Sequence, residues 1–370
     1  MPLLKSYVTW NNKGGVGKTT LTFHMATQYA LNHPLETVLV IDICPQANVS
    51  SALLRGMENV ARLTYQRKTV SFYLHQVSSS YDLSTVNLQA FLTQVNGLNN
   101  QIPSNVYLLC GDIHLETVAR SLEQKRNANL VDDSSWVFVT SSVRYFIEGH
   151  CYNDYAGTPF FKPGVACQPG GWVVFIDTNP SFSVYTEIAL LAAQRLIIPV
   201  NADNFSREAL KSLLHLVYGI AEAELPPEFE LYDHKLTFSY KSKTKGLRLP
   251  LIYLLIHNRA TRYNLRSAQA FHQLFTSSFD ALQCALKSNR ECFEPKPLGP
   301  LQEPQVNQYL VDLYDFHTDG IVALHYGCPL AALKKHYTLS SVPIVNGTVA
   351  LSSQQIDIHL QNLNNLVAKL

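Results

Sequence analysis

The sequence predicts an α/β fold, a doubly wound and mostly parallel sheet flanked by helices. Three observations predict it. A glycine-rich segment stands between a short apolar run and a helical pattern near the start, later β-branched runs alternate with further helical patterns, and one of these runs ends at Asp177. Buried strands that alternate with helices form a parallel sheet covered on both faces, with ligands at the carboxyl ends of the strands.

The first elements form a strand–loop–helix–strand unit. Ser6–Trp10 is a short β-rich run, and Thr19–Tyr29 has a helical apolar stripe that ends before Pro34. A proline disfavours helix at the residue before it, so the helix stops there. Val38–Ile41 is a continuous β-branched run, as expected of a parallel strand buried on both faces.

The same alternation continues along the chain. The further expected strands are Val106–Leu109, Val173–Ile176, Leu196–Val200 and Leu251–Ile256. The further expected helices are Val70–His75 with the leucine-rich stretch to Leu98, Leu115–Leu122, Tyr185–Ala193, Arg207–Ala221, Arg266–Ala285 and Ile356–Leu370. These elements place several loops at the carboxyl edge of one sheet.

The length and composition fit one large domain. The chain has 370 residues, and single cores stop growing near roughly 250–300 residues. We therefore expect one domain over 1–370, with insertions at 132–171 and 225–248, where the alternation breaks. The formal net charge is only +1, so contact with nucleic acid would need a local basic patch.

The segment NNKGGVGKTT has the residues of a phosphate-binding P-loop. Its three glycines let the backbone approach phosphate oxygens closely, and the helix that follows aims unpaired N–H groups at the loop. Lys18 supplies a point charge for the β- and γ-phosphates, and the Thr19 hydroxyl is placed to ligate Mg²⁺. The expected nucleotide-binding residues are Lys13, Gly14, Gly15, Val16, Gly17, Lys18, Thr19 and Thr20. The cofactors expected here are ATP and Mg²⁺.

Four stretches, in order, resemble one family. The strict P-loop has a glycine where this chain has Asn12, and Lys13 precedes the glycine pair. KGGVGKTT at 13–20 closely resembles the deviant Walker A motif of the ParA/MinD family of P-loop ATPases, and the chain is most similar to ParA-type partition proteins. IDICPQANVS at 41–50 resembles that family's switch I, FIDTNPS at 175–181 its Walker B and switch II, and LIIPVNADNFSREAL at 196–210 the strand and helix that follow.

The resemblance implies an ATP-dependent sandwich homodimer in which Lys13 reaches the partner's phosphates. A solvated loop lysine is the alternative for Lys13. The resemblance also implies that Asp177 holds Mg²⁺ through water and that Asp42 lies near the metal, whereas an aspartate at a strand end also serves as a helix N-cap. Asn258 and Arg259 resemble the place where the family contacts adenine, although a loop asparagine also caps the next element.

Cys44 replaces the second aspartate of the resembled switch I, which orients water for attack on the γ-phosphate. A thiol with a pKa of about 8.5 is mostly protonated at neutral pH and does not orient a nucleophile as a carboxylate does. One hypothesis is therefore slow or partner-dependent hydrolysis, with Lys13, Lys18, Asp42 and Cys44 as the residues that set the rate. The alternative is that another acidic residue substitutes and turnover is ordinary for this slow family.

Partner predictions also follow from the resemblance. ParA-like members bind DNA non-specifically through clustered cations, and the candidates are Lys241, Lys243, Lys245, Arg248, Arg262 and Arg266. Solvated surface charges explain the same run equally well. A ParB-like or other protein activator is implied as well. MinD-like members bind membranes through a C-terminal helix, but the polar face of Ile356–Leu370 is mainly Gln and Asn, which favours core or dimer packing.

The expected location is the cytoplasm, with association with the nucleoid if DNA is bound. The N-terminus has no basic segment followed by an apolar one, and the seven cysteines form no CxxC pairs. The leading function is ATP-driven partitioning or positioning of DNA cargo. The second is an ATP-gated regulatory or scaffold protein of a multi-component assembly with little or no hydrolysis. Turnover measured with and without DNA would separate them.

Overall fold

One eight-stranded sheet organises the chain. The computed structural model describes residues 3–80, 86–126, 134–151, 170–201, 204–220, 237–260, 280–297, 305–337, 342–344 and 347–370. The strands run in the order β3-β4-β2-β5-β1-β6-β7-β8. They are β1 Leu3–Thr9, β2 Thr37–Ile43, β3 Thr93–Gln94, β4 Val106–Leu109, β5 Trp172–Thr178, β6 Arg195–Val200, β7 Leu251–Ala260 and β8 Leu310–Tyr314. All neighbours pair in parallel except β3 and β4.

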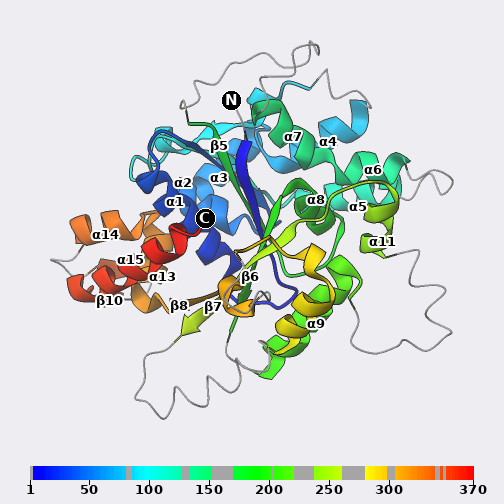
Figure 1. Ribbon diagram of the computed structural model, residues 1–370. Helices are drawn as coiled ribbons and strands as arrows, with labels where there is room; N and C mark the ends of the chain where they lie inside the picture. The colour runs from blue at the N-terminus through cyan, green and yellow to red at the C-terminus, as the bar shows by residue number, and fades with distance from the viewer. Residues whose placement is uncertain are drawn as a thin grey trace.

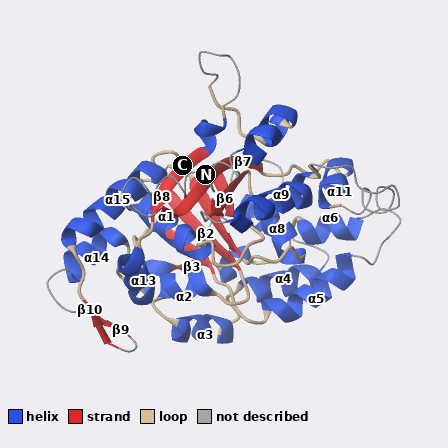
Figure 2. Cartoon of the chain, turned by 90° about the horizontal axis from the view of Figure 1, so that it is seen from below, coloured by secondary structure: helices blue, strands red, loops and turns tan. Residues whose placement is uncertain are grey.

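Helices cover both faces of this sheet (Figures 1 and 2). One layer holds α1 Lys18–Asn32, α2 Asn48–Leu54, α3 Met57–Tyr65, α13 His317–Tyr326, α14 Leu330–Tyr337 and α15 Ser353–Val367. The other holds α4 Val70–Ser80, α5 Leu115–Arg126, α6 Ser134–Thr140, α7 Ser142–Cys151, α8 Val184–Ala192, α9 Asn204–Tyr218 and α11 Phe238–Thr244. A short hairpin of β9 Val342–Ile344 and β10 Gly347–Val349 stands apart from the sheet.

Strand alternation explains the two layers. Side chains of successive strand residues point to opposite faces, so Tyr7 and Phe175 join the core under α1 while Val8 and Ile176 join the core under α8. All seven residues of β2 and of β5 are buried. Continuous apolar runs are what a strand covered on both faces requires, and this confirms the doubly wound α/β prediction.

The segment up to Leu98 corrects one prediction. We expected helix there, but beyond α4 the described residues form 3₁₀ turns at Leu88–Phe91 and Val95–Gly97 around the short β3. Asparagine side chains compete for backbone groups in this stretch. The Asn96 amide donates to the Ile102 carbonyl at 2.6 Å, and the Asn99 amide donates to the carbonyls of Leu53 and Gly327. Such bonds favour turns over helix.

Part of the expected insertions is described and carries helices. The range 132–171 contains α6 and α7, and 225–248 contains α11, whereas 152–169 and 225–236 lie outside the described residues. The assignment of these ranges as insertions stays a prediction. Of the helix expected over Arg266–Ala285, residues 280–288 are helical and 266–279 lie outside the described part.

The C-terminal helix α15 belongs to the core. It packs on α1, and Ile356, Leu363 and Leu366 are buried there. The Lys5 ammonium and the Tyr7 hydroxyl both donate to the carbonyl of Leu370, which fixes the chain end against β1. The apolar stripe therefore serves internal packing. Within the described residues, no helix is long and apolar enough to cross a membrane.

Candidate nucleotide site

The glycine-rich loop lies between β1 and α1, at the carboxyl edge of the sheet. Gly17 is the N-cap of α1 with φ of 87°, and no side chain caps the helix. A Cβ on Gly17 would lie 2.2 Å from the Asn258 amide, so only glycine fits this approach. The first N–H groups of α1 therefore face the loop without a side-chain acceptor, which makes an anion site.

Lys18 is buried and held inside the loop. Its ammonium donates to the carbonyls of Asn11 and Lys13 at 3.0 and 2.9 Å. Burial lowers its pKa to about 8, and the nearby Asp177 carboxyl opposes this change. A polyanion that enters the loop would stabilise the charged lysine, as the P-loop mechanism requires.

Two asparagines shape the loop, and the sequence analysis did not assign them roles. The Asn11 amide donates to the Pro199 carbonyl at 2.7 Å, while its oxygen accepts from the Lys13 N–H at 3.0 Å. Asn12, at the position where the strict motif has glycine, donates to the Ser212 hydroxyl of α9 at 2.8 Å. The bonds to Pro199 and Ser212 fix the loop to β6 and α9, and these two partners are 188 and 200 positions away in the sequence.

Thr19 and Asp177, the two residues expected to hold magnesium, are hydrogen-bonded to each other. The Thr19 hydroxyl donates to an Asp177 carboxylate oxygen at 2.8 Å, and the Thr22 hydroxyl to the other at 3.3 Å. Asp177 is fully buried, and burial together with Asp42 raises its pKa to about 8. A divalent cation would stabilise the ionised carboxylate.

The donor set fits Mg²⁺ as a partner of ATP. Hard oxygen ligands from one hydroxyl and one carboxylate suit this ion, which takes its remaining ligands from water and phosphate. No group of three His, Cys, Asp or Glu side chains able to hold a metal occurs among the described residues. Thr19 and Asp177 would hold the ion, and it would supply positive charge at the phosphate oxygens.

Asp42 neighbours Asp177 across β2 and β5, but its oxygens are already engaged. One accepts from the Cys44 N–H at 3.1 Å, and the other accepts from the N–H and the hydroxyl of Ser50 at 3.0 and 2.7 Å. Burial raises its pKa to about 6 despite these bonds. Asp42 thus fixes the turn that carries Cys44. Its predicted role near the metal stays a prediction.

A cavity of about 580 Å³ opens over these groups. Three loops and the start of α5 line it, and all of them lie at the carboxyl edge of the sheet. The lining residues are Gly14, Gly15, Gly17, Lys18, Thr19, Thr20, Cys44, Pro45, Gln46, Asn48, Glu116, Thr178, Asn179 and Pro180. The structure thus brings together the P-loop, the predicted switch I and the predicted switch II residues.

Cys44 lies at this cavity as a protonated thiol. Its side chain is nearly buried, and burial raises its pKa to about 12, with Asp42 and Asp177 acting in the same direction. A thiol in this environment supplies no negative charge at neutral pH. The thiol thus differs in charge from the aspartate of the resembled motif, and slow hydrolysis stays a prediction.

The predicted adenine contacts are placed only in part. The Asn258 amide donates to the Val16 carbonyl at 3.0 Å, which ties the end of β7 to the P-loop. This bond shows a loop-supporting role, and an adenine contact stays a prediction. The Arg259 side chain lies outside the described part of the structure.

Two of the predicted DNA-binding cations, Lys243 and Arg248, lie at the opposite edge of the sheet. Lys241 and Lys243 are on α11 and Lys245 follows it, while Arg262 and Arg266 are outside the described residues. The exposed Lys243 and Arg248 line a cavity of about 670 Å³ at the amino ends of β1, β6 and β7. Three glutamates, Glu148, Glu291 and Glu294, share this cavity, so its charge is mixed.

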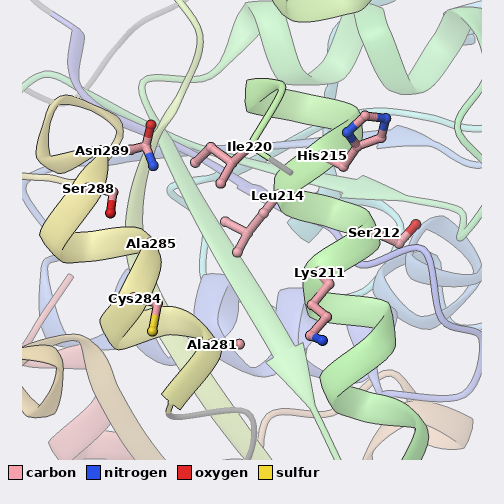
Figure 3. A pocket seen from close by; sticks show the side chains of 10 residues that line it. All are labelled: Lys211, Ser212, Leu214, His215, Ile220, Ala281, Cys284, Ala285, Ser288 and Asn289. Atoms are coloured by element: carbon pink, nitrogen blue, oxygen red, sulfur yellow. The ribbon is translucent and has the colours of Figure 1, made fainter. Parts of the chain in front are cut away.

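A third cavity, of about 610 Å³, separates α9 from residues 280–288 (Figure 3). Its floor is apolar, with Leu214, Ala281 and Ala285 buried. Ser212 lines it and also accepts the hydrogen bond from Asn12. The groove is therefore joined to the P-loop through one hydrogen bond.

Comparison with known proteins agrees with this geometry. A family model described as an AAA domain, AAA_31, matches residues 5–134 and 172–230, more than half of the chain. The chromosome partitioning protein ParA of Caulobacter vibrioides is 28% identical over 227 residues, 61% of this chain and 67% of that protein. The chain belongs to the ParA/MinD-type family of P-loop ATPases.

The chain is also similar to a second curated protein and, in fold, to solved structures. The sporulation initiation inhibitor protein Soj of Bacillus subtilis is 26% identical over 208 residues, 56% of this chain and 62% of Soj. Apo McdA from Cyanothece has a TM-score of 0.56 at 14% identity, over 97% of this chain and 99% of McdA. An ATP complex of McdA has a TM-score of 0.57 at 14% identity, over 100% of this chain and 98% of McdA. At that identity the structures support the shared fold alone.

Proposed function

We propose that the chain is a ParA-like ATPase that binds ATP with Mg²⁺, forms a nucleotide-sandwich homodimer and partitions or positions DNA cargo. The observation that carries this proposal is the cavity in which glycines of the P-loop meet Cys44 and Thr178. Lys18 would bind the phosphates there, and Thr19 with its hydrogen-bond partner Asp177 would hold the magnesium ion.

In this proposal, Lys13 makes dimerisation depend on ATP. Lys18 is held by carbonyls of its own loop and serves the phosphates of its own subunit. A second lysine supplied by the partner neutralises a triphosphate further, because two cations balance more of its charge than one. Dimerisation is then conditional on ATP and reverses when the γ-phosphate is lost.

Hydrolysis is slow in this proposal, and a ParB-like or other protein activator accelerates it. The support is Cys44, whose buried and protonated thiol stands where a carboxylate is expected. A slow step keeps the dimer long-lived and lets a partner control its release.

DNA binding is non-specific and depends on the ATP-bound dimer. Lys241, Lys243, Lys245 and Arg248 supply the described part of a basic surface, with Arg262 and Arg266 as further candidates. Doubling this surface in a dimer raises the number of phosphate contacts, and affinity rises steeply with that number. The protein would then act in the cytoplasm, associated with the nucleoid.

A second function is an ATP-gated regulatory or scaffold protein with little or no hydrolysis. The same Cys44 observation favours it, because a nucleotide that is bound and not cleaved acts as a structural ligand. The α6, α7 and α11 helices would then present surfaces to an assembly. Turnover measured with and without DNA separates this function from the first.

The deciding experiment measures binding to non-specific duplex DNA with ATP, with ADP and without nucleotide, over a salt series. The partition proposal expects salt-sensitive binding only with ATP. Absence of binding in all three states would contradict it and favour the regulatory function.

A further inference from the structure

Hydrolysis of ATP needs a group that orients water, and Cys44 does not provide one. Its thiol is buried, and a thiol is a much weaker hydrogen-bond acceptor than a carboxylate. The neighbouring groups Lys18 and Thr19 serve phosphate and metal. A carboxylate elsewhere on the wall of the nucleotide cavity could act on water instead.

Most carboxylates near this cavity are already engaged. Asp42 accepts three hydrogen bonds from the turn of Cys44 and Ser50, and Asp177 accepts from Thr19 and Thr22. Asp112, after β4, accepts from the hydroxyls of Thr69 and Ser71 and from the His114 N–H. All three aspartates are buried.

Glu116 differs from these three aspartates because it is exposed. It lies in the first turn of α5, after β4, and β4 is the direct neighbour of the strand that carries Cys44. It is the one acidic side chain among the described residues that line the nucleotide cavity. Its carboxylate is exposed and accepts a long hydrogen bond of 3.4 Å from the Tyr185 hydroxyl. Such a carboxylate keeps most of its acceptor capacity for water.

Tyr185 also connects Glu116 to the loop that follows Asp177. The Asn179 amide donates to the Tyr185 hydroxyl at 2.8 Å, and Asn179 lines the same cavity. Tyr185 itself is buried, so this connection has a fixed geometry. A shift of the Asn179 loop on nucleotide binding would move Tyr185 and, through it, the Glu116 carboxylate.

We propose that Glu116 is the carboxylate that orients the attacking water in place of the residue missing at Cys44. This inference rests on the ATP hydrolysis in the proposed function. The water oxygen bonds to the γ-phosphorus while the bond from that phosphorus to the bridging oxygen breaks, and its electron pair stays on ADP. The proton of the water passes to the Glu116 carboxylate and then to solvent. Tyr185 acts as a positioning residue.

The test compares turnover of the wild type with that of Glu116→Gln. The amide keeps the size of the side chain but accepts no proton, and loss of such a group costs about 10²–10⁴-fold in rate. We expect turnover to fall by at least about tenfold while the dissociation constant for Mg·ATP changes less than about twofold. Tyr185→Phe is expected to lower turnover by a smaller factor. Glu123→Gln on the same helix, away from the cavity, is the matched control and keeps wild-type turnover.

A second variant and a binding measurement separate this role from a structural one. Cys44→Asp in the Glu116→Gln background is expected to restore turnover, because a carboxylate returns to the same cavity. Capture of ADP with aluminium fluoride is expected to weaken in Glu116→Gln, while capture of ADP alone is unchanged.

Three outcomes would overturn the inference. Wild-type turnover in Glu116→Gln overturns it and leaves the proposed hydrolysis intact. A loss of ATP affinity in proportion to the loss of turnover overturns it as well, since Glu116 would then act on binding. A wild type without any turnover, alone or with DNA, contradicts the proposed hydrolysis and this inference together.

Discussion

At the scale of single residues, the proposed slow hydrolysis rests on Cys44. Its thiol lies on the wall of the nucleotide cavity, and burial keeps it protonated. Cys44→Asp is expected to raise basal turnover by about 10-fold or more, because a carboxylate orients water where the thiol cannot. Steady-state phosphate release measures this.

Cys44→Ser is the control for that measurement. It changes the side chain without adding charge, so turnover is expected to stay at the wild-type level. Unchanged or lower turnover in a folded Cys44→Asp protein would count against the role assigned to this position.

His24 predicts how stability depends on pH. It lies on α1 and is fully buried, and neither ring nitrogen has a hydrogen-bond partner among the described residues. Burial lowers its pKa from 6.5 to about 3, and the neighbouring His359 acts in the same direction. The unfolded chain therefore binds a proton below pH 6.5 that the folded chain does not bind. His24 favours unfolding progressively as the pH falls from 6.5 towards 3.

His24→Leu removes this titration. Relative to the wild type, the free energy of unfolding of the variant is expected to rise by up to about 1.4 kcal/mol for each pH unit below 6.5. Denaturant unfolding at pH 7.5, 6, 5 and 4.5 measures it. His75→Leu, at an exposed position of α4, is the matched control for replacing a histidine by leucine. A difference between His24→Leu and the wild type that does not change with pH would refute the buried neutral state.

Part of the site could be predicted from the sequence, because its signals are local. Spacing alone predicts the phosphate loop, since Lys18 and Thr19 follow the glycines directly and α1 starts at once. The roles of Asn12 and Glu116 could not be predicted in this way. Asn12 bonds to Ser212, and Glu116 accepts from Tyr185, so both contacts depend on elements far apart in the sequence.

At the scale of elements, the buried strands were predictable and the short helices were not. β2 and β5 are continuous apolar runs buried along their length. α2 and α6 have seven residues each, too short for a clear helical stripe, and tertiary packing sets their positions. The strand β8 was not predicted from the sequence. It lies at the edge of the sheet, and its buried and exposed residues alternate, so it lacks the continuous apolar run of the central strands.

The helix α11 is the element on which the proposed DNA binding depends. Phe238 packs it against Phe182, the exposed Lys243 lies on it, and the exposed Arg248 follows it. Replacing both cations by alanine is expected to weaken binding to duplex DNA in the ATP state and to lower the slope of log K against log salt by about 2. Fluorescence anisotropy over a salt series measures both effects.

The matched control replaces Arg62 and Arg120, exposed cations on α3 and α5. It removes the same net charge elsewhere on the surface and should leave the slope unchanged. Equal losses in the two double variants would mean that α11 has no special part in DNA binding, and that overall charge alone accounts for the affinity.

At the scale of the whole molecule, the sheet separates the nucleotide cavity from the residues proposed to bind DNA. The nucleotide cavity lies at the carboxyl ends of β1, β2 and β5, and the cavity with Lys243 and Arg248 lies at the amino ends of β1, β6 and β7. ATP therefore has no direct contact with the described DNA candidates. In the proposed function, a dimer links ATP binding to DNA binding, because a pair of subunits doubles the basic surface once ATP holds the subunits together.

The most direct measurement is the mass of the protein in solution by sedimentation, with a slowly hydrolysed ATP analogue, with ADP and without nucleotide. The account predicts a dimer for the wild type only with the analogue. Lys13→Ala is predicted to bind the analogue and to stay monomeric, because the lysine acts on the partner's phosphates. A wild type that stays monomeric with the analogue, or a Lys13→Ala variant that dimerises as the wild type does, would contradict the account.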